Sequence, residues 1–274
     1  MTIKDTIKKY TNKLKLVTHI PAKEVEILML HLLEKNTIWL HLNYNVEFEK
    51  EKELEVLVKK RATNYPLEYI INKASFYGEM FIVKEGVLIP RPETEILVEN
   101  AIEILKDKKE IKVLEIGTGS GIISVMLAML IENIKIIAVD INEKALDLAK
   151  QNAIKHGVEN KIEFRLSNLY ENVQENDIFM TISNPPYIAN NYILPTNVKY
   201  EPSNALFGGV VGDELLKDII KATSEKKIPY LLCEMGYDQK TPLENYFKEF
   251  NIESYSFYKD YESFDRGFTL KFKN

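Results

Sequence analysis

A glycine-rich turn and an acidic residue further along the chain are the first residues whose types and spacing suggest ligand binding. A strand-like apolar run ends at Ile116 and is followed by Gly117-Thr118-Gly119-Ser120-Gly121. Glycines in such a turn let the backbone bend sharply and let a ligand approach the main chain closely. The next predicted strand ends at Asp140, whose carboxylate can accept hydrogen bonds from both ribose hydroxyls of a nucleoside. The pattern therefore predicts a nucleoside-binding site.

The spacing of the glycines separates two kinds of nucleotide-binding turn. The pattern is Gly-x-Gly-x-Gly, whereas dinucleotide-binding proteins carry Gly-x-Gly-x-x-Gly. Together with Glu115 before it and Asp140 after the next strand, the turn resembles that of class I S-adenosylmethionine-dependent methyltransferases. The resemblance implies that S-adenosylmethionine is the cofactor and that Glu115, the residues of the turn and Asp140 bind it.

A second group of residues, Asn184-Pro185-Pro186-Tyr187, follows the fourth predicted strand. Open α/β sheets bind their ligands outside the carboxyl ends of the strands, so we expect this motif to face the reactive methyl group. The prolines fix the backbone and remove two N–H donors. The acceptors that remain, the Asn184 side-chain carbonyl and the Pro185 main-chain carbonyl, match the two N–H bonds of an NH₂ group on a planar carbon. The motif therefore predicts methylation of an amide or aryl amine nitrogen.

The chemistry of such a nitrogen explains why no general base accompanies the motif. Its lone pair is delocalised into the adjacent π-system, so the nitrogen must be oriented toward the methyl group. Acceptors that hold both N–H bonds also stabilise the positive charge that develops on the nitrogen during attack. We expect Tyr187 to pack against the face of the planar group. The motif resembles that of adenine-N6 methyltransferases and equally that of glutamine-N5 methyltransferases, so it leaves both targets open.

The hydrophobic pattern after residue 92 alternates between helices and strands. It predicts helices over 93–107, 120–131, 143–156, 213–225 and 240–249, and strands over 111–116, 135–139, 161–166, 178–182, 229–234, 252–258 and 267–272. Strands and helices that alternate in this way are typical of an α/β fold with a doubly wound, mostly parallel sheet.

The chain before this region has a different pattern and predicts two further parts. Over residues 1–70, apolar residues recur at helical spacing, as in the series from Ile3 to Leu14. Over residues 71–92, alternating apolar residues with Gly78 and Gly86 between them predict a β-hairpin linker. We therefore expect a helical domain over 1–70, this linker, and a third domain over 93–274.

The composition excludes several classes of protein. The chain of 274 residues has 36 Lys and Arg against 41 Asp and Glu, a net charge of -5, so it is not a general polyanion binder. Its one cysteine and four scattered histidines predict neither a disulfide nor a metal site. No apolar run is long enough to span a bilayer, and the first residues lack the apolar core of a signal peptide. We expect a cytoplasmic monomer that does not bind a membrane.

Several further segments extend the resemblance beyond the methyltransferase motifs. They are Pro66-Leu67-Glu68-Tyr69, Phe76-Tyr77-Gly78, Ile89-Pro90-Arg91-Pro92-Glu93-Thr94-Glu95, Tyr200-Glu201-Pro202, Gly208-Gly209, Gly212-Asp213, Glu234-Met235-Gly236 and Asp260-Tyr261 with Arg266. In this order they resemble the HemK/PrmC family, the glutamine-N5 methyltransferases of bacterial peptide chain release factors. Arg91 and Arg266 lie within these segments, where a planar guanidinium is hard to replace by lysine, and we expect them to hold structure or substrate loops.

The resemblance implies a fold, a substrate and a set of site residues. The fold would be a helical N-terminal domain, a hairpin linker and a seven-stranded class I methyltransferase domain whose last strand is antiparallel. The substrate would be the glutamine of the Gly-Gly-Gln motif in class-1 release factors. The segment from Asn184 to Tyr187 would bind that glutamine, with Asn184, Pro185 and Tyr187 as catalytic residues, and Asn184 would also contact the cofactor.

The chain departs from the family at the residues expected near the adenine. The family has an Asp followed by an aromatic residue after the third strand, whereas this chain has Asn168-Leu169. The Asn168 carbonyl can still accept a hydrogen bond from the adenine amine, and Leu169 offers apolar contact. We expect the pocket to persist with weaker cofactor affinity.

The main rival is an adenine-N6 methyltransferase that acts on DNA or RNA. Such an enzyme needs a basic surface for the phosphate backbone, and a DNA enzyme must also flip its base. Residues 1–70 carry 12 Lys and Arg against 10 Asp and Glu, which is a weak charge for that purpose. We therefore expect no direct contact with nucleic acid and assign the helical domain to docking of the release factor.

Overall fold

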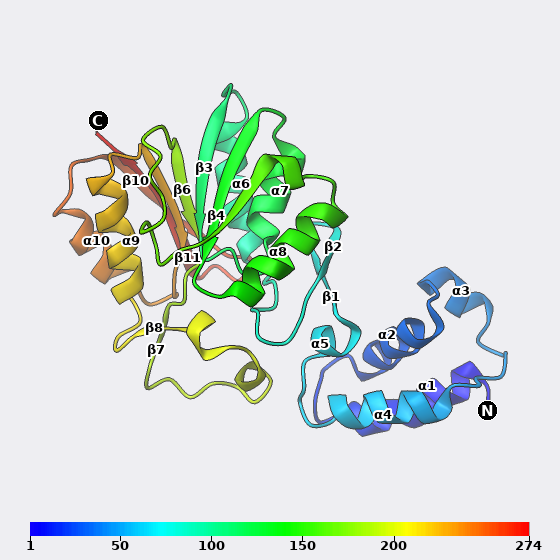
Figure 1. Ribbon diagram of the computed structural model, residues 1–274. Helices are drawn as coiled ribbons and strands as arrows, with labels where there is room; N and C mark the ends of the chain where they lie inside the picture. The colour runs from blue at the N-terminus through cyan, green and yellow to red at the C-terminus, as the bar shows by residue number, and fades with distance from the viewer. Residues whose placement is uncertain (274) are drawn as a thin grey trace. The chain divides into compact units, whose positions relative to one another are not determined.

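The computed structural model describes residues 1–273, which divide into two units (Figure 1). The first unit comprises Met1–Lys73 together with Leu194–Tyr200. The second comprises Ala74–Ile193 and the residues from Glu201 onward. No helix within residues 1–273 is both long and apolar enough to cross a bilayer.

The first unit is built from short amphipathic helices. They are α1 (Ile3–Leu14), α2 (Pro21–Leu33), α3 (Thr37–Leu42), α4 (Glu51–Arg61) and α5 (Leu67–Ile71). The predicted face of α1 is buried from Ile3 to Leu14, and a buried ion pair joins Arg61 Nε to Glu24 Oε2 at 2.6 Å. The segment Leu194–Tyr200, which includes the 3₁₀ turn η2 (Val198–Tyr200), joins this unit through the Tyr200 hydroxyl, which donates to the Thr63 carbonyl at 3.1 Å.

The predicted hairpin is shorter in the structure than in the sequence analysis. Its strands are β1 (Lys73–Phe76) and β2 (Glu79–Ile82), with Gly78 in the turn at a φ of 78°. The prediction that the hairpin extends to residue 92 is wrong, because a second turn closes at Val87, whose N–H donates to the Lys84 carbonyl. The chain then passes Pro90 and Pro92, which lack N–H donors for a ladder.

The second unit contains a seven-stranded sheet. Its strands in spatial order are β10 (Ile252–Lys259), β11 (Asp265–Phe272), β9 (Tyr230–Glu234), β6 (Met180–Ser183), β3 (Ile111–Ile116), β4 (Ile134–Asp140) and β5 (Ile162–Leu166). Strand β11 runs antiparallel to both of its neighbours, β10 and β9, and the other neighbouring pairs of this sheet are parallel. The predicted α/β fold, with a seven-stranded sheet whose last strand is antiparallel, is confirmed.

Helices cover both faces of this sheet (Figure 1). They are α6 (Thr94–Leu105), α7 (Ile122–Leu130) and α8 (Glu143–Lys155) on one face, and α9 (Glu214–Glu225) and α10 (Lys240–Phe247) on the other. Alternate side chains of a strand point to opposite faces. Val113 of β3 accordingly packs in the core under α6 and α7, whereas Leu114 packs in the core under α9 and α10.

The order of the strands brings two loops together at one edge of the sheet. From β3 the chain continues outward to β4 and β5, and it then returns to place β6 on the other side of β3. Ile116 and Ser183, the last residues of β3 and β6, are register partners. The glycine turn and the Asn184 motif leave the sheet from these two residues. Ligands of doubly wound sheets bind at such a change of strand direction, which is where the site lies.

Candidate active site

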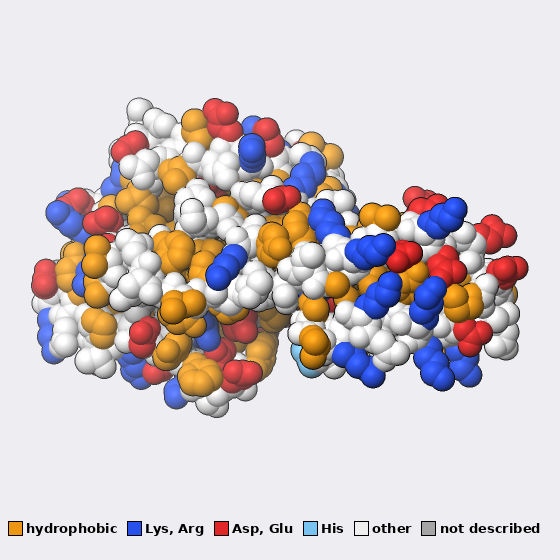
Figure 2. All heavy atoms as spheres, turned by 90° about the horizontal axis from the view of Figure 1, so that it is seen from below, with side chains coloured by type: hydrophobic (Ala, Val, Ile, Leu, Met, Phe, Trp, Pro, Cys, Tyr) orange, Lys and Arg blue, Asp and Glu red, His pale blue; other side chains and the backbone are white. Residues whose placement is uncertain are grey.

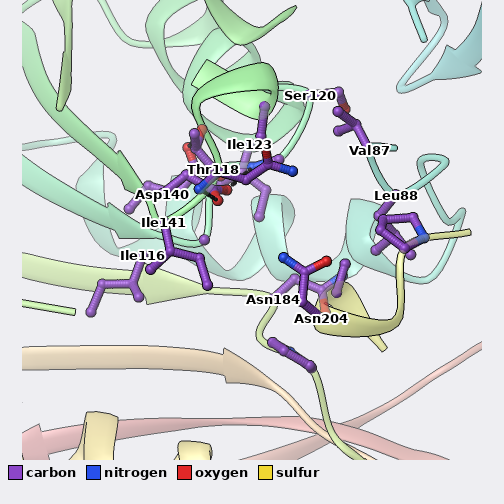
Figure 3. Close-up of a pocket in the computed structure, with 18 of the residues that line it drawn as sticks. Val87, Leu88, Ile116, Thr118, Ser120, Ile123, Asp140, Ile141, Asn184 and Asn204 are labelled. Atoms are coloured by element: carbon purple, nitrogen blue, oxygen red, sulfur yellow. Dashed lines mark hydrogen bonds between the residues drawn. The ribbon is translucent and has the colours of Figure 1, made fainter. Parts of the chain in front are cut away.

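A cavity opens at the carboxyl ends of β3 and β4 within the second unit. It is lined by most of the predicted site residues: Glu115, Gly117, Thr118, Gly119, Ser120, Asp140, Asn168, Leu169, Asn184 and Pro186. Figure 3 shows Thr118, Asp140, Asn184 and Asn204 among the lining residues. Gly121, Pro185 and Tyr187 are not part of the lining. The structure therefore places both predicted motifs around one space.

The glycine turn takes a backbone shape that other residues adopt only with strain. Gly119 has a φ of 55° and Gly121 a φ of 81°, both in the left-handed region. A Cβ on Gly121 would lie 2.9 Å from Ala149 Cβ, so the glycine also allows the start of α7 to pack against α8. Gly121 thus shapes the turn from behind, while Gly119 borders the cavity.

Asp140 is held by backbone donors on both of its carboxylate oxygens. Gly119 N–H donates to Oδ2 at 2.9 Å and Asn142 N–H donates to Oδ1 at 2.9 Å. Burial raises the pKa of Asp140, and these hydrogen bonds oppose the rise. A carboxylate oxygen can accept a second hydrogen bond, so the pair remains able to bind two hydroxyls. The hydrogen bond from Gly119 also ties Asp140 to the glycine turn.

Glu115 combines deep burial with an unused acceptor. Its Oε2 accepts hydrogen bonds from Thr118 Oγ1 at 2.8 Å and from the N–H and hydroxyl of Ser124. Its Oε1 is buried and has no hydrogen-bond partner within residues 1–273. Burial raises the pKa of Glu115 to about 7. An unpaired carboxylate oxygen in a cavity wall is suited to a cationic group such as an ammonium.

Asn168 and Leu169 are the two residues at which the chain departs from the family pattern of an Asp followed by an aromatic residue. Asn168 Nδ2 donates to Glu171 Oε1 at 2.9 Å, which leaves the side-chain carbonyl oxygen of Asn168 as the free end of its amide. Leu169 has a φ of 47°, an uncommon conformation for a residue with a side chain. Both residues line the cavity, so they are placed to contact a flat ligand group there.

The Asn184 motif is anchored by two buried residues that the predicted site did not include. Asn184 Nδ2 donates to Thr94 Oγ1 at 2.9 Å, and Thr94 Oγ1 donates to Glu234 Oε2 at 2.7 Å. The Tyr187 hydroxyl donates to the other oxygen, Glu234 Oε1, at 2.8 Å. Within residues 1–273, no hydrogen bond reaches Asn184 Oδ1 or the Pro185 carbonyl. The two acceptors that the sequence predicted are therefore both unused.

A signal for these two anchors was present in the sequence. Thr94 and Glu234 lie in segments that carry the family resemblance, and Glu234 ends strand β9. The rule that sites gather at the carboxyl ends of strands points to Glu234 as it does to Asp140. Nothing in the spacing shows that Thr94 and Glu234 contact each other, because 140 residues separate them.

A small two-stranded parallel sheet packs against the backbone of the Asn184 motif. Its strands are β7 (Ile188–Ala189) and β8 (Phe207–Gly209), which follows the 3₁₀ turn η3 (Ser203–Ala205). A Cβ on Gly208 would lie 2.4 Å from the Pro186 carbonyl oxygen, and one on Gly212 would lie 2.6 Å from the Tyr187 carbonyl oxygen. These glycines let the loop lie directly against the backbone of the motif, which keeps the motif rigid.

The two arginines singled out in the sequence hold loops. Arg91 Nη2 pairs with Glu201 Oε1 at 2.5 Å, and Glu201 Oε2 accepts from Ile89 N–H at 3.0 Å. Arg266 binds Asp260 Oδ2 through Nε at 3.0 Å and Nη2 at 2.7 Å. Since Ile89 and Arg91 line the cavity, the first ion pair fixes one of its walls.

Two family models match the chain. One, described as "Methyltransferase small domain", matches residues 93–198, and the other, described as "PrmC N-terminal domain", matches residues 5–71.

Two curated relatives illustrate the similarity over the whole chain. A protein of Fusobacterium nucleatum named release factor glutamine methyltransferase is 36% identical over 260 residues, which cover 92% of this chain and 73% of that protein. A protein of Aquifex aeolicus with the same name is 36% identical over 256 residues, which cover 89% of each chain.

Solved structures share the fold at low identity. The hMettl16 catalytic domain in complex with a MAT2A 3′UTR hairpin superposes with a TM-score of 0.57 at 15% identity, covering 69% of this chain and 74% of that one. A ribosomal protein L11 methylase from Lactobacillus delbrueckii subsp. bulgaricus superposes with a TM-score of 0.50 at 20% identity, covering 70% of this chain and 84% of that one. Both are similar in the arrangement of their elements.

Proposed function

The chain belongs to the release factor glutamine methyltransferase family, and from this premise we propose that it methylates the side-chain amide N5 of the glutamine in the Gly-Gly-Gln motif of class-1 release factors. The observation that carries the proposal is the pair of unused acceptors, Asn184 Oδ1 and the Pro185 carbonyl, next to a cavity with a nucleoside-type carboxylate. An amide NH₂ has two donors that match them. The site therefore suits a glutamine side chain beside a nucleoside cofactor.

The residues of the cavity fit S-adenosylmethionine, which supplies an electrophilic methyl group on a sulfonium sulfur. Asp140 would accept from the two ribose hydroxyls, and the unpartnered Oε1 of Glu115 would accept from the ammonium. The glycine turn leaves its main chain open to the ligand, and Asn168 and Leu169 would border the adenine. These assignments account for the buried Oε1 of Glu115, which has no hydrogen-bond partner in the described part of the chain, residues 1–273.

The Asn184 motif would perform the chemistry by orientation and by preset dipoles. Asn184 Oδ1 and the Pro185 carbonyl would accept the two N–H bonds of the glutamine amide and direct its nitrogen toward the methyl group. Both oxygens carry partial negative charge, so they stabilise the positive charge that develops on nitrogen. The alkylated nitrogen is cationic and acidic, so one of its N–H bonds loses its proton to water after the transfer, and the residues need no base before it. Tyr187 would support the planar group from its position beside Glu234.

An adenine-N6 enzyme would need a basic surface for its nucleic acid. Figure 2 shows basic and acidic side chains interspersed on the face that it presents, without a continuous basic area over the helical unit. The mixed charge agrees with 12 Lys and Arg against 10 Asp and Glu over residues 1–70. A surface of this kind favours a protein substrate over a polyanion.

A substrate panel tests the proposal. The chain is incubated with S-adenosylmethionine labelled in its methyl group and with a class-1 release factor, a DNA duplex or a structured RNA. We expect label in the release factor alone, and a release factor whose Gly-Gly-Gln glutamine is replaced by alanine should stay unlabelled. Label in DNA or RNA, with none in the release factor, would overturn the proposal.

The pH dependence of cofactor binding follows from Glu115. Its pKa of about 7 means that raising the pH through neutrality ionises the carboxyl and creates a partner for the ammonium. We expect the affinity for S-adenosylmethionine to rise about tenfold from about pH 6 to about pH 8. Isothermal titration across this range measures the change, with Glu115→Gln as the variant that cannot ionise. A pH dependence as steep in Glu115→Gln would remove Glu115 from the ammonium site.

The same carboxyl affects the stability of the ligand-free protein in the opposite sense. Because its pKa in the folded state lies above the ordinary value, its contribution to stability is present at low pH and is lost as the pH rises toward 7. Cofactor binding therefore stabilises the protein most at pH values above about 7, at which the ionised Glu115 makes the ligand-free protein least stable.

We also assign docking of the release factor to the first unit. A glutamine side chain offers few distinguishing atoms, so selectivity must come from contacts remote from the reacting amide. Helix α3 exposes Ile38 and Leu42, at 72% and 81% of their surface, one turn apart on the same side of the helix. Apolar side chains exposed at this spacing suit a protein partner.

Polar substitutions on α3 test this assignment without removing any buried contact. We expect the double change Ile38→Ser and Leu42→Ser to lower kcat/KM for intact release factor by about tenfold, the loss of one strong contact. A short Gly-Gly-Gln peptide should react slowly and equally with both proteins. Leu16→Ser, at a fully exposed leucine of the same unit, is the matched control. Equal losses for the peptide and for the intact factor would show that α3 has no part in docking.

A further inference from the structure

Thr94 and Glu234 form a buried polar pair directly behind the Asn184 motif. Thr94 is the first residue of α6 and is 0% exposed, and Glu234 is the last residue of β9 and is 1% exposed. Burying a carboxyl group costs free energy unless hydrogen bonds compensate. The cost indicates that this pair has a role that an apolar pair of similar size would not fill.

The hydrogen bonds of the pair have a definite direction. Thr94 Oγ1 donates to Glu234 Oε2 at 2.7 Å, and the Tyr187 hydroxyl donates to Glu234 Oε1 at 2.8 Å. Burial raises the pKa of Glu234, and the hydrogen bonds from Thr94 and Tyr187 and the charge of Arg266 oppose the rise. Both hydroxyls are donors in this arrangement, so both hydroxyl protons point toward Glu234. A hydroxyl has one proton. Thr94 Oγ1 can therefore take part in any further hydrogen bond only as an acceptor.

This direction determines which end of the Asn184 amide faces Thr94. The amide has a donor end, Nδ2, and an acceptor end, Oδ1. Since Thr94 Oγ1 can only accept, the donor end must face it, as it does at 2.9 Å. The acceptor end is then left without a partner within residues 1–273 and stays available in a residue that lines the cavity.

We propose that Thr94 and Glu234 are positioning residues that set the orientation of the Asn184 amide and so present its oxygen, rather than its NH₂ group, to the substrate amide. The inference rests on the proposed function, because the orientation matters only if the substrate brings N–H donors. With the amide reversed, two NH₂ groups would face each other, and the substrate would lose one of its two acceptors. The pair thus acts on the reaction through Asn184: Thr94 borders the cavity beside Asn184, and Glu234 lies behind Thr94 and is not part of the lining.

The alternative is that Thr94 and Glu234 only fill space in the core. The two accounts differ in what the hydroxyl of Thr94 does. Thr94→Val keeps the shape of the side chain and removes the hydroxyl, so Asn184 Nδ2 loses its acceptor. Thr94→Ser removes only the methyl group and keeps the hydroxyl. A space-filling role makes the valine variant the milder of the two, whereas a positioning role makes the serine variant the milder.

The experiment measures kcat and KM for transfer to the release factor, together with the Kd for S-adenosylmethionine. We expect Thr94→Val to lower kcat by about 10²-fold, the scale for one positioned polar group, with cofactor affinity unchanged within about twofold. Thr94→Ser should keep kcat within about fivefold of the wild type. Thr223→Val is the matched control: Thr223 is a fully buried threonine on α9, its hydroxyl bonds Tyr170 at 2.6 Å, and it does not line the cavity.

Glu234→Gln provides a second variant should Thr94→Val fail to fold. Thr94 and Tyr187 donate to different oxygens of Glu234, and in a glutamine one of these two positions becomes an NH₂ donor, so one of the two hydroxyls loses its acceptor. We expect a fall in kcat with an unchanged Kd for S-adenosylmethionine.

The outcomes separate this inference from the proposed function. If the wild type labels the release factor and Thr94→Val lowers kcat no more than Thr223→Val does, the positioning role is overturned and the function stands. The positioning role is also overturned if Thr94→Ser is slower than Thr94→Val. If the wild type does not label the release factor, the proposed function fails and the inference fails with it.

Discussion

Replacing Asn184 with alanine is expected to slow methyl transfer by about 10²–10³-fold, the effect of deleting one preset hydrogen-bond acceptor at a site of developing charge. The loss should appear in kcat, because the acceptor acts most strongly when the nitrogen becomes positive. The fold and most of the cofactor affinity should remain, since Asp140 and the glycine turn bind elsewhere in the cavity. Single-turnover transfer to the release factor measures the rate, and isothermal titration measures the cofactor affinity.

The matched control for this change is Asn190→Ala. Asn190 lies just beyond the motif, is exposed, and contributes its backbone N–H to the Gly209 carbonyl at 2.9 Å, a bond that alanine keeps. We expect this control to retain its activity. An Asn184→Ala rate within about twofold of the wild type would contradict the mechanism, because one positioned acceptor at this point is worth far more.

Replacing Asp140 with alanine is expected to abolish most cofactor binding. Two hydrogen bonds from ribose hydroxyls to a carboxylate contribute about 1.5–3 kcal/mol each, so the Kd should rise by at least about 10²-fold. The structure adds a second source of loss, because Asp140 also accepts from Gly119 N–H and Asn142 N–H. Removing the carboxylate therefore loosens the glycine turn as well as the ribose site.

Thermal unfolding with and without S-adenosylmethionine measures this effect. The wild type should gain stability with cofactor, because the ligand binds only the folded state, and Asp140→Ala should lose most of that gain. Asp147→Ala, at an exposed aspartate of α8, is the control and should behave as the wild type does. An unchanged gain in Asp140→Ala would exclude Asp140 from the ribose site.

Much of this architecture follows from local patterns in the sequence. Strand β3 could be predicted because it is a short apolar run that ends at a glycine turn, and α1 because Ile3, Ile7 and Tyr10 recur at helical spacing. The parallel sheet follows from the alternation of strands and helices. The family resemblance then implied the antiparallel last strand, which β11 confirms.

The parts that could not be predicted depend on contacts between distant residues. The region from Val87 to Ile89 has the alternation of a strand, yet it lines the cavity because the turn at Gly86 and the prolines at 90 and 92 prevent pairing. The Arg91–Glu201 ion pair joins residues 110 positions apart. No local pattern reports such a contact, since tertiary packing alone brings the partners together.

The most direct test of the account is to locate the added methyl group in the product. A release factor incubated with the chain and S-adenosylmethionine is digested and analysed by tandem mass spectrometry, with Asn184→Ala in parallel. The account predicts one added methyl group on the side chain of the Gly-Gly-Gln glutamine with the wild type, and an almost unmodified peptide with the variant. An unmodified glutamine with the wild type, or a methyl group on a different residue, would contradict it.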